Sequence, residues 1–328
     1  MKGKYRDMKN LTYAKPIVGT WFSIYWYDKR HYYWNEACMK FTAEQWDALI
    51  ADMASVGLKY IVMCNVISEN KCIYDSKLVP KIQMGCDDPM EAVMLAADKY
   101  DMHIFMTNDY YLDESFDRVL TPEHTAGRNA IMQEVALRYS HHKSFYGWYW
   151  AREAYIGPYF SEDFIKYVNI SSEYARKLTP GCKILTAPYG TKNAVNDDKF
   201  VDQLKRLDVD IIAYQDTVGC FATDVDGSER AFEILRKAHD RVPQRALWAD
   251  VETFDWEGKD NIKETPLISA KFERLESQLR AVSPYVDNIL VFIFQGLFTN
   301  PESIAYTGYK EGARYWNEYQ NWFNEHKK

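Results

Sequence analysis

The chain has 328 residues, 47% of them hydrophobic and 27% charged, with a formal net charge of −7. This composition, without a long block of like charge, excludes a disordered protein and offers no basic surface for nucleic acid or anionic lipid. Aromatic residues make up 16% of the chain, with 10 Trp and 25 Tyr, which is more than a core requires and suits flat hydroxylated ligands such as sugars.

One pattern recurs along the chain: a short apolar run, a polar loop and an amphipathic helix. The expected strands are residues 17–26, 60–66, 102–108, 145–150, 183–187, 210–215, 245–251 and 288–294. The expected helices are residues 42–56, 89–100, 122–139, a segment starting at Ser161, 197–207, 228–238, 267–282 and 308–323. Thr42 with Gln45 predicts a capping box, and an aromatic loop containing Tyr32, Tyr33 and Trp34 is expected before it.

Eight strand and helix pairs in strict alternation predict a parallel sheet, and eight is the number that closes it into a (β/α)8 TIM barrel. We expect one domain over residues 1–328, with an extended N-terminal segment and a closing C-terminal helix. An open doubly wound sheet is the alternative. It would carry a glycine-rich turn after its first strand, and neither G-x-G-x-x-G nor a P-loop occurs here.

The six cysteines form no C-x-x-C pair and have no histidine at metal spacing, so the sequence predicts neither a zinc site nor a disulfide framework, and no cofactor. No stretch approaches 18 apolar residues, so no membrane span is expected. The N-terminus lacks an apolar signal segment. We therefore expect a periplasmic or extracellular protein if a signal peptide has been removed, and a cytoplasmic one otherwise; the oligomeric state stays open.

Glu153 is the most suggestive single residue, because it follows an aromatic strand that reads as buried up to Trp150. A carboxyl group at such a strand end can meet a ligand without being wholly buried. The alternative is a structural ion pair with Arg152 or Arg128.

In a TIM barrel the chemistry lies at the C-terminal ends of the strands, and polar and aromatic residues gather there in this sequence. Carboxylates among rings and amides are what glycoside hydrolysis requires: a protonated acid, an ionised partner and platforms for sugar rings. We predict Glu153, Glu252 and Asp216 as catalytic candidates. The predicted carbohydrate-binding residues are Trp21, Trp26, Asn108, Asp109, Trp150, Tyr155, Tyr189, Tyr214, Gln215, Trp248, Asp250, Trp256 and Gln295.

Carboxylates after the fourth and seventh strands resemble those of a large clan of TIM-barrel glycoside hydrolases, which implies Glu153 as acid/base and Glu252 as nucleophile. The chain also resembles glycosidase-like barrels of unknown function from polysaccharide-degrading gut bacteria, through Gly-Thr-Trp-Phe at 19–22, Gly-Trp-Tyr-Trp-Ala-Arg-Glu at 147–153 and Ala-Tyr-Gln-Asp-Thr-Val-Gly at 213–219. One position departs from the clan: Arg152 stands where an Asn usually precedes the acid. Asp216 or Asp250 therefore stays open as the partner of Glu153.

Two other classes of protein compete with a glycosidase. A metal-dependent sugar isomerase or deacetylase needs histidines among the strand-end carboxylates, and only His103 lies on an expected strand, near its start. His141 and His142 lie at a helix end, where solvent exposure or a dipole contact is the simpler explanation. A non-catalytic carbohydrate-binding barrel would keep the rings without needing the carboxylates.

Overall fold

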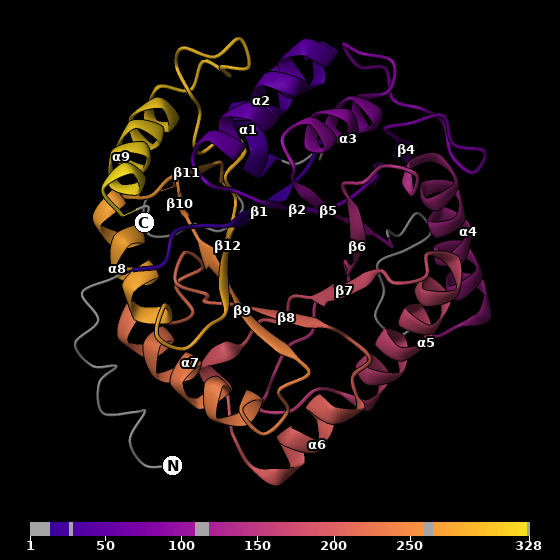
Figure 1. Cartoon of the computed structure of the whole chain (residues 1–328), viewed down its shortest axis with the longest axis vertical. Helices are drawn as coiled ribbons and strands as arrows, with labels where there is room; N and C mark the ends of the chain where they lie inside the picture. The colour runs from indigo at the N-terminus through magenta and orange to yellow at the C-terminus, as the bar shows by residue number, and fades with distance from the viewer. Residues whose placement is uncertain (1–13, 26–28, 109–117, 259–264, 327–328) are drawn as a thin grey trace.

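The structure, a computed structural model, describes residues 14–25, 29–108, 118–258 and 265–326. Eight parallel strands close into a barrel, as predicted (Figure 1). They are β1 (Gly19–Phe22), β2 (Tyr60–Met63), β5 (His103–Thr107), β6 (Phe145–Trp150), β7 (Lys183–Thr186), β8 (Ile211–Gln215), β9 (Ala246–Glu252) and β12 (Asn288–Phe292).

Helices form a ring around the barrel (Figure 1). They are α2 (Ala43–Ser55), α3 (Pro89–Lys99), α4 (Pro122–Tyr139), α5 (Glu162–Leu178), α6 (Asp198–Arg206), α7 (Val225–His239), α8 (Phe272–Val282) and α9 (Lys310–His326). Each follows one barrel strand, so the helices cover the outer face of the sheet and run back toward the strand starts.

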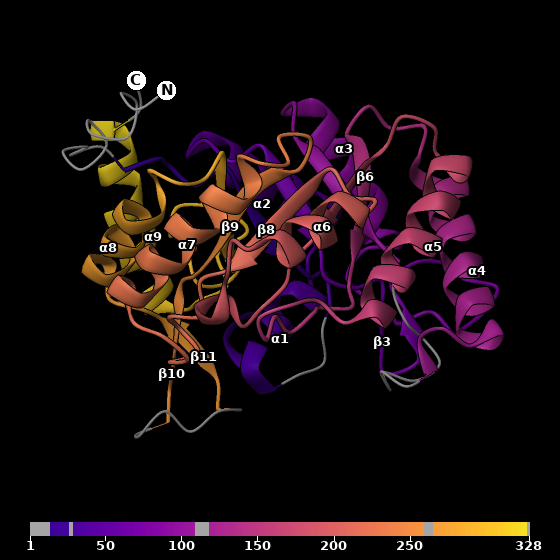
Figure 2. The same ribbon diagram turned by 90° about the horizontal axis from the view of Figure 1, so that it is seen from below.

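Neighbouring barrel strands are in parallel register. The strand order is β1-β12-β9-β8-β7-β6-β5-β2, and closure occurs because Gly19 of β1 pairs with Leu290 of β12 on one side and with Tyr60 of β2 on the other. Since all strands run the same way, their C-terminal ends meet at one end of the barrel. The helix α1 (Tyr32–Met39) and the hairpin of β10 (Phe254–Trp256) and β11 (Leu267–Ser269) extend from that end (Figure 2).

Six helices in the ring begin with a side-chain N-cap. The cap residues are Thr42, Asp88, Thr121, Ser161, Asp197 and Asp224, and each accepts a hydrogen bond from the backbone N–H three residues later. The predicted capping box is confirmed, because Gln45 also accepts from the Thr42 N–H at 3.0 Å. Caps of this kind satisfy backbone donors that a helix start leaves unpaired.

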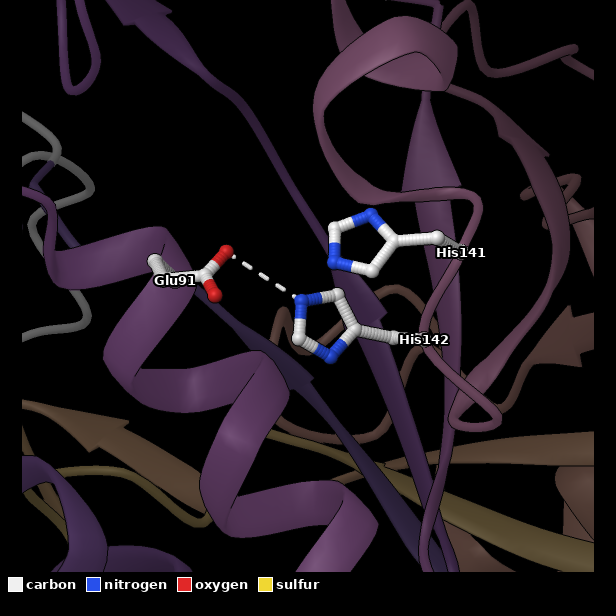
Figure 3. A group of neighbouring side chains, drawn as sticks. All are labelled: Glu91, His141 and His142. Carbon is white, nitrogen blue, oxygen red and sulfur yellow. Dashed lines mark hydrogen bonds and ion pairs between the residues drawn. The ribbon is translucent and has the colours of Figure 1, made fainter.

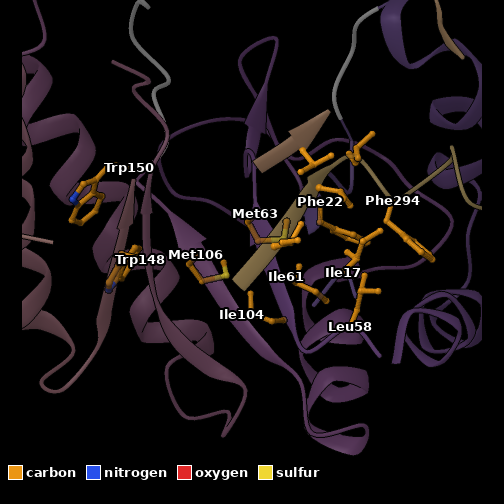
Figure 4. Packing of buried hydrophobic residues seen from close by; sticks show 14 of the residues in the cluster. Ile17, Phe22, Leu58, Ile61, Met63, Ile104, Met106, Trp148, Trp150 and Phe294 are labelled. Carbon is orange, nitrogen blue, oxygen red and sulfur yellow. The ribbon is translucent and has the colours of Figure 1, made fainter. Parts of the chain in front are cut away.

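Two apolar layers follow from the alternation of side chains along the strands. One lies between strands and helices and includes Phe22, Ile61, Ile104, Trp148 and Trp150 (Figure 4). The other fills the barrel interior with the side chains of Trp21, Val62, Phe105, Tyr149, Leu185, Ile211, Ala213, Trp248 and Leu290. The interior is therefore a packed core, and a ligand has access only from an end of the barrel.

Two predicted segments differ from the structure. Leu267–Ser269, expected as the start of a helix, is strand β11 and pairs antiparallel with Phe254–Trp256, so the helix begins only at Phe272. The expected aromatic loop instead contains helix α1, whose buried side chains include Trp34 and Cys38. Packing of one face against the barrel stabilises this short helix despite its weak intrinsic preference.

All six cysteines are free thiols, of which Cys38, Cys72 and Cys182 are buried. None of the helices in the described part of the chain is long and apolar enough to cross a membrane.

Candidate active site

Carboxyl groups gather at the end of the barrel where the strands finish. Glu153 follows β6, Asp216 follows β8, and Asp250 and Glu252 lie on β9. Burial raises the pKa of Asp250, and repulsion from the charges of Glu252, Asp216 and Glu153 adds to the rise, so each of these three groups lies within electrostatic reach of Asp250. The barrel therefore brings the three catalytic candidates together with the alternative partner, Asp250.

Two of these carboxylates, Asp250 and Glu252, face the barrel interior. Asp250 lies two residues after Trp248, whose ring packs inside the barrel, and Glu252 lies two residues further along the same face. Glu252 also pairs across the sheet with Phe292, whose side chain packs against the interior cluster. Both residues are almost completely buried, so only the end of the barrel can give them access to a ligand.

Glu153 is the exposed member of the group. Loss of hydration within the surrounding protein raises the pKa of Glu153 to about 7. A hydrogen bond with Gln215 and the positive charge of Arg30 act in the opposite direction and lower this pKa. Solvent still reaches this side chain, so Glu153 loses only part of its hydration. A carboxyl group that is both accessible and able to hold a proton near neutral pH has the properties of a general acid.

Arg128, a candidate for a structural ion pair with Glu153, lies in the layer between the strands and the helices. Arg128 is buried, donates to the Val119 carbonyl at 2.7 Å and lies 4.9 Å from the centre of the Tyr167 ring. The groups that lower the pKa of Glu153 are Gln215 and Arg30.

Glu252 is held by a backbone amide. Its Oε2 accepts a hydrogen bond from the Cys220 N–H at 2.6 Å, in the loop after β8. Burial raises the pKa of Glu252 to about 7, and repulsion from Asp216 acts in the same direction, while the Cys220 amide and Arg274 oppose it. Gly219 leaves room for this contact, because a Cβ at that position would lie 2.8 Å from the Glu252 Cβ. The loop after β8 thus positions a carboxylate that belongs to β9.

Asp216 points away from the interior and is fully enclosed. One of its oxygens accepts from the Glu252 N–H at 3.1 Å and the Val218 N–H at 3.3 Å, and the other accepts from Gln278 of α8 at 2.7 Å. Burial raises the pKa of Asp216 to about 6, and these hydrogen bonds oppose that rise. Both carboxyl oxygens are therefore occupied, and the side chain ties β9 to α8 behind the strand that carries Glu252.

Asp250 is buried, and its Oδ1 has no hydrogen-bond partner within the described residues. Burial raises the pKa of Asp250 well above its ordinary value, and the neighbouring carboxylates add to the effect. The native state therefore retains the Asp250 proton over a pH range in which the unfolded chain has lost it. As a result, the free energy of unfolding decreases as pH rises above the pKa of this carboxyl group in the unfolded chain, about 4.

Replacing Asp250 with Asn should accordingly raise the melting temperature more at pH 8 than at pH 4, because Asn has no charge to bury. Thermal unfolding followed by circular dichroism at both pH values measures this difference. An equal shift at the two pH values would indicate a packing effect and contradict the role of ionisation.

The remaining predicted binding residues divide by their position. Five lie on the inner face of the barrel or beyond the strand ends: Trp21, Trp248, Gln215, Tyr155 and Tyr189. Tyr155 and Tyr189 are 54% and 40% exposed, and their ring centres lie 5.4 Å apart. Among the predicted rings that the structure describes, they are the exposed pair. Trp256 lies on the β10–β11 hairpin, and Trp26 and Asp109 lie outside the described residues.

Four of the predicted binding residues bond to neighbouring elements of the fold. Trp150 donates to Ser172 of α5, and Tyr214 shares a hydrogen bond with His239 of α7. Asn108 bonds to Tyr167 of α5, and Gln295 accepts from the Ser23 N–H at 2.9 Å. All four are buried and take part in these structural contacts.

Two side chains close to the carboxylates were not among the predictions. Tyr149 packs inside the barrel edge-on to Trp21, at 5.9 Å between ring centres. Burial raises the pKa of Tyr149, and the charges of Glu153 and Asp250 add to the rise. Arg30, in a 3-10 turn at Lys29–His31, acts electrostatically on Glu153. The alternation along β6 was a usable signal for Tyr149, whereas the position of Arg30 depends on a loop.

The only described group with metal-binding proximity lies elsewhere. Glu91, His141 and His142 come together between α3 and the turn that precedes β6, at the opposite end of that strand from Glu153 (Figure 3). His142 is buried, with Nδ1 2.8 Å from Asp98 and Nε2 3.2 Å from Glu91. Because both ring nitrogens contact carboxylates of α3, His142 joins that helix to the turn.

The family described as "Domain of unknown function (DUF4434)" matches residues 17–305 of the chain. No match was found among curated proteins. Among solved structures, the chain is similar to a proposed alpha-L-fucosidase from Bacteroides thetaiotaomicron VPI-5482, with a TM-score of 0.74, 19% identity and coverage of 95% of this chain and 94% of the other.

Two more distant structures share the barrel. An endo-1,4-beta-mannanase from Rhizomucor miehei has a TM-score of 0.59 and 11% identity, with 94% of this chain and 95% of the other covered. A beta-galactosidase from Halorubrum lacusprofundi has a TM-score of 0.60 and 11% identity, with 94% of this chain and 58% of the other covered. These similarities show the fold, and they confirm the resemblance to glycosidase-like TIM barrels.

Proposed function

The chain belongs to the DUF4434 family of unknown function, and we propose that it is a glycoside hydrolase that cleaves a glycosidic bond in an oligosaccharide or polysaccharide. The observation that carries the proposal is the pair Glu153 and Glu252, which follow and end two separate barrel strands at the same end of the barrel. One is accessible, the other is held by a backbone amide, and burial raises the pKa of each to about 7.

In this proposal Glu153 is the general acid. Its proton passes to the glycosidic oxygen as the bond to the anomeric carbon breaks, so the leaving group departs as a neutral alcohol and not as a strongly basic alkoxide. Glu252 supports the opposite face of the sugar, either by bonding to the anomeric carbon or by taking a proton from an attacking water. The exposed rings of Tyr155 and Tyr189 offer apolar surface for a sugar face beside Glu153.

Asp216 supports this chemistry indirectly in the same proposal. Its carboxylate accepts from the backbone N–H of Glu252 and from Gln278, so it holds the end of β9 in place. Asp250 is the second candidate for the partner of Glu153, because it shares the interior face of β9 and has an unpaired oxygen. The hydrogen bond from Cys220 favours Glu252, since that bond fixes an ionised carboxylate in one orientation.

Screening aryl glycosides together with plant and host glycans, with products followed by NMR, tests the proposal. Hydrolysis of any glycoside supports it, and the configuration of the first-formed product shows whether the enzyme retains or inverts the anomeric centre. Binding of glycans without hydrolysis would instead support the second candidate function, a non-catalytic carbohydrate-binding barrel. Neither binding nor hydrolysis across the panel would overturn both.

The rate should depend on pH as a narrow bell with its maximum near neutrality. The acid must be protonated, so the rate falls as pH rises through the pKa of Glu153, about 7; the partner must be ionised, so the rate falls as pH drops through the pKa of Glu252, also about 7. Measurement of kcat/KM across pH on one aryl glycoside checks this shape. A rate that keeps rising well into the alkaline range would exclude an acid with a pKa near neutrality.

A further inference from the structure

A pocket lies beside helix α1, between that helix and the segment leading into α9. It has a volume of about 430 Å³ and is lined by Tyr32, Tyr33, Glu36, Ala37, Lys40, Thr307, Gly308, Tyr309 and Lys310. Helix α1 extends from the end of the barrel that carries the carboxylates, as does the adjacent β10–β11 hairpin (Figure 2). The pocket therefore lies at the rim of the barrel, at the end that carries the candidate active site, and we call it the rim pocket. The residues that line it have no part in the chemistry proposed above.

One wall of this rim pocket is a fixed pair of tyrosines. The rings of Tyr33 and Tyr309 are stacked, with centres 4.5 Å apart and planes inclined by 22°. The Tyr309 hydroxyl accepts a hydrogen bond from the Ser269 N–H of β11, and the Tyr33 hydroxyl donates to Glu257 next to β10. Because the hairpin anchors both hydroxyls, the aromatic wall is preorganised and a ligand need not order it.

Tyr32 adds an exposed ring to the same pocket. It is 68% exposed and meets Tyr33 edge-on, with ring centres 5.3 Å apart. The opposite face of α1 is buried through Trp34 and Cys38, so the helix is anchored without any contribution from Tyr32. A large ring left open to solvent on an anchored helix is available for a ligand.

The polar residues of the pocket indicate what kind of ligand would suit it. Glu36 and Lys40 form an exposed ion pair at 2.6 Å at the C-terminal end of α1, and Lys310 adds a hydrogen-bonding group on the other side. Aromatic faces beside charged and hydroxyl groups match a sugar, whose C–H faces stack on rings while its hydroxyls bond to polar side chains. The volume falls within the range of small-ligand sites.

We propose that the rim pocket binds a sugar residue of the same glycan that the enzyme cleaves, at a distance from the cleaved bond. This inference rests on the proposed function. It adds that the substrate is a glycan long enough to reach from the strand ends to α1. Binding energy from this remote contact would be used to hold the chain across the active site end.

The variant Tyr32→Ala tests the inference, since this exposed ring can be removed without disturbing the core. On the longest oligosaccharide that the wild type cleaves, kcat/KM should fall by roughly five- to tenfold. On the 4-nitrophenyl monosaccharide of the same sugar it should stay unchanged, because that probe cannot reach α1. The control Leu137→Ala removes another exposed apolar side chain, 86% accessible on α4, and should alter neither rate.

The outcomes separate this inference from the proposed function. Wild-type cleavage of both probes, with equal rates for Tyr32→Ala and wild type on the oligosaccharide, would overturn the rim pocket and leave the hydrolase intact. A fall on both probes would also overturn it, because loss of the remote contact alone cannot affect the short probe. Absence of glycan cleavage and binding by the wild type would overturn both.

Discussion

The Glu153→Gln enzyme should turn over natural glycans at least about a hundredfold more slowly than the wild type, the usual scale of general acid catalysis. Gln keeps the size of the side chain and its contact with Gln215 but has no proton to give to the leaving oxygen. Aryl glycosides with acidic phenols need little help from an acid, so their cleavage should suffer much less. Turnover numbers on one natural substrate and one activated aryl glycoside measure the difference.

A matched control is Glu325→Gln, which removes a carboxylate from an exposed position on α9. It should keep wild-type rates on both substrates. The alkaline fall in the pH profile should also disappear in Glu153→Gln when the activated substrate is used, because that fall reports the loss of the acid's proton. Wild-type turnover of natural glycans by Glu153→Gln would remove Glu153 from the mechanism.

Glu252→Ala should lose at least about a thousandfold in turnover on natural and activated substrates alike, since the partner carboxylate is needed whatever the leaving group. If Glu252 bonds to the anomeric carbon, added azide should restore cleavage of an activated aryl glycoside. Azide then forms the bond to the anomeric carbon as the phenolate departs, and the product is a glycosyl azide of inverted configuration. NMR of the product identifies it.

Asp216→Asn provides the contrast, because the carboxylate it replaces holds Glu252 from behind. Asn has only one oxygen for three donors, the N–H groups of Glu252 and Val218 and the amide of Gln278, so the free energy of unfolding should fall by about 1–3 kcal/mol. Activity should fall less than in Glu252→Ala, and azide should not restore it. An active Glu252→Ala beside an inactive Asp216→Asn that responds to azide would exchange their assigned roles.

Most of the barrel could be predicted because each strand and helix has its own local pattern. The predicted strand 145–150 matches β6, and the predicted helix 122–139 matches α4. Leu267–Ser269 could not be read this way, because an apolar run beside a helix resembles the helix, and its pairing with β10 is a tertiary contact. The helix α1 had a readable signal, since Trp34 and Cys38 lie one turn apart on its buried face.

The candidate site shows a similar division. Alternate residues of a strand lie on the same face of the sheet. This pattern alone places Gln215 on one face and Tyr214 and Asp216 on the other. The same reasoning separates Tyr149 from Trp150 on β6. Contacts that cross from one loop to another strand, such as the Cys220 amide on Glu252, depend on the shape of the loop and have no local pattern in the sequence.

The capped helix starts affect how this protein can change. Thr42, Asp88, Thr121, Ser161, Asp197 and Asp224 each fix the beginning of a helix through a contact within that helix alone. A loop that joins a strand end to such a helix can therefore lengthen or shorten without changing the residue at which the helix begins. Since these loops surround the end that carries the carboxylates, relatives of this chain can diverge in the ligands they recognise while the barrel beneath stays the same.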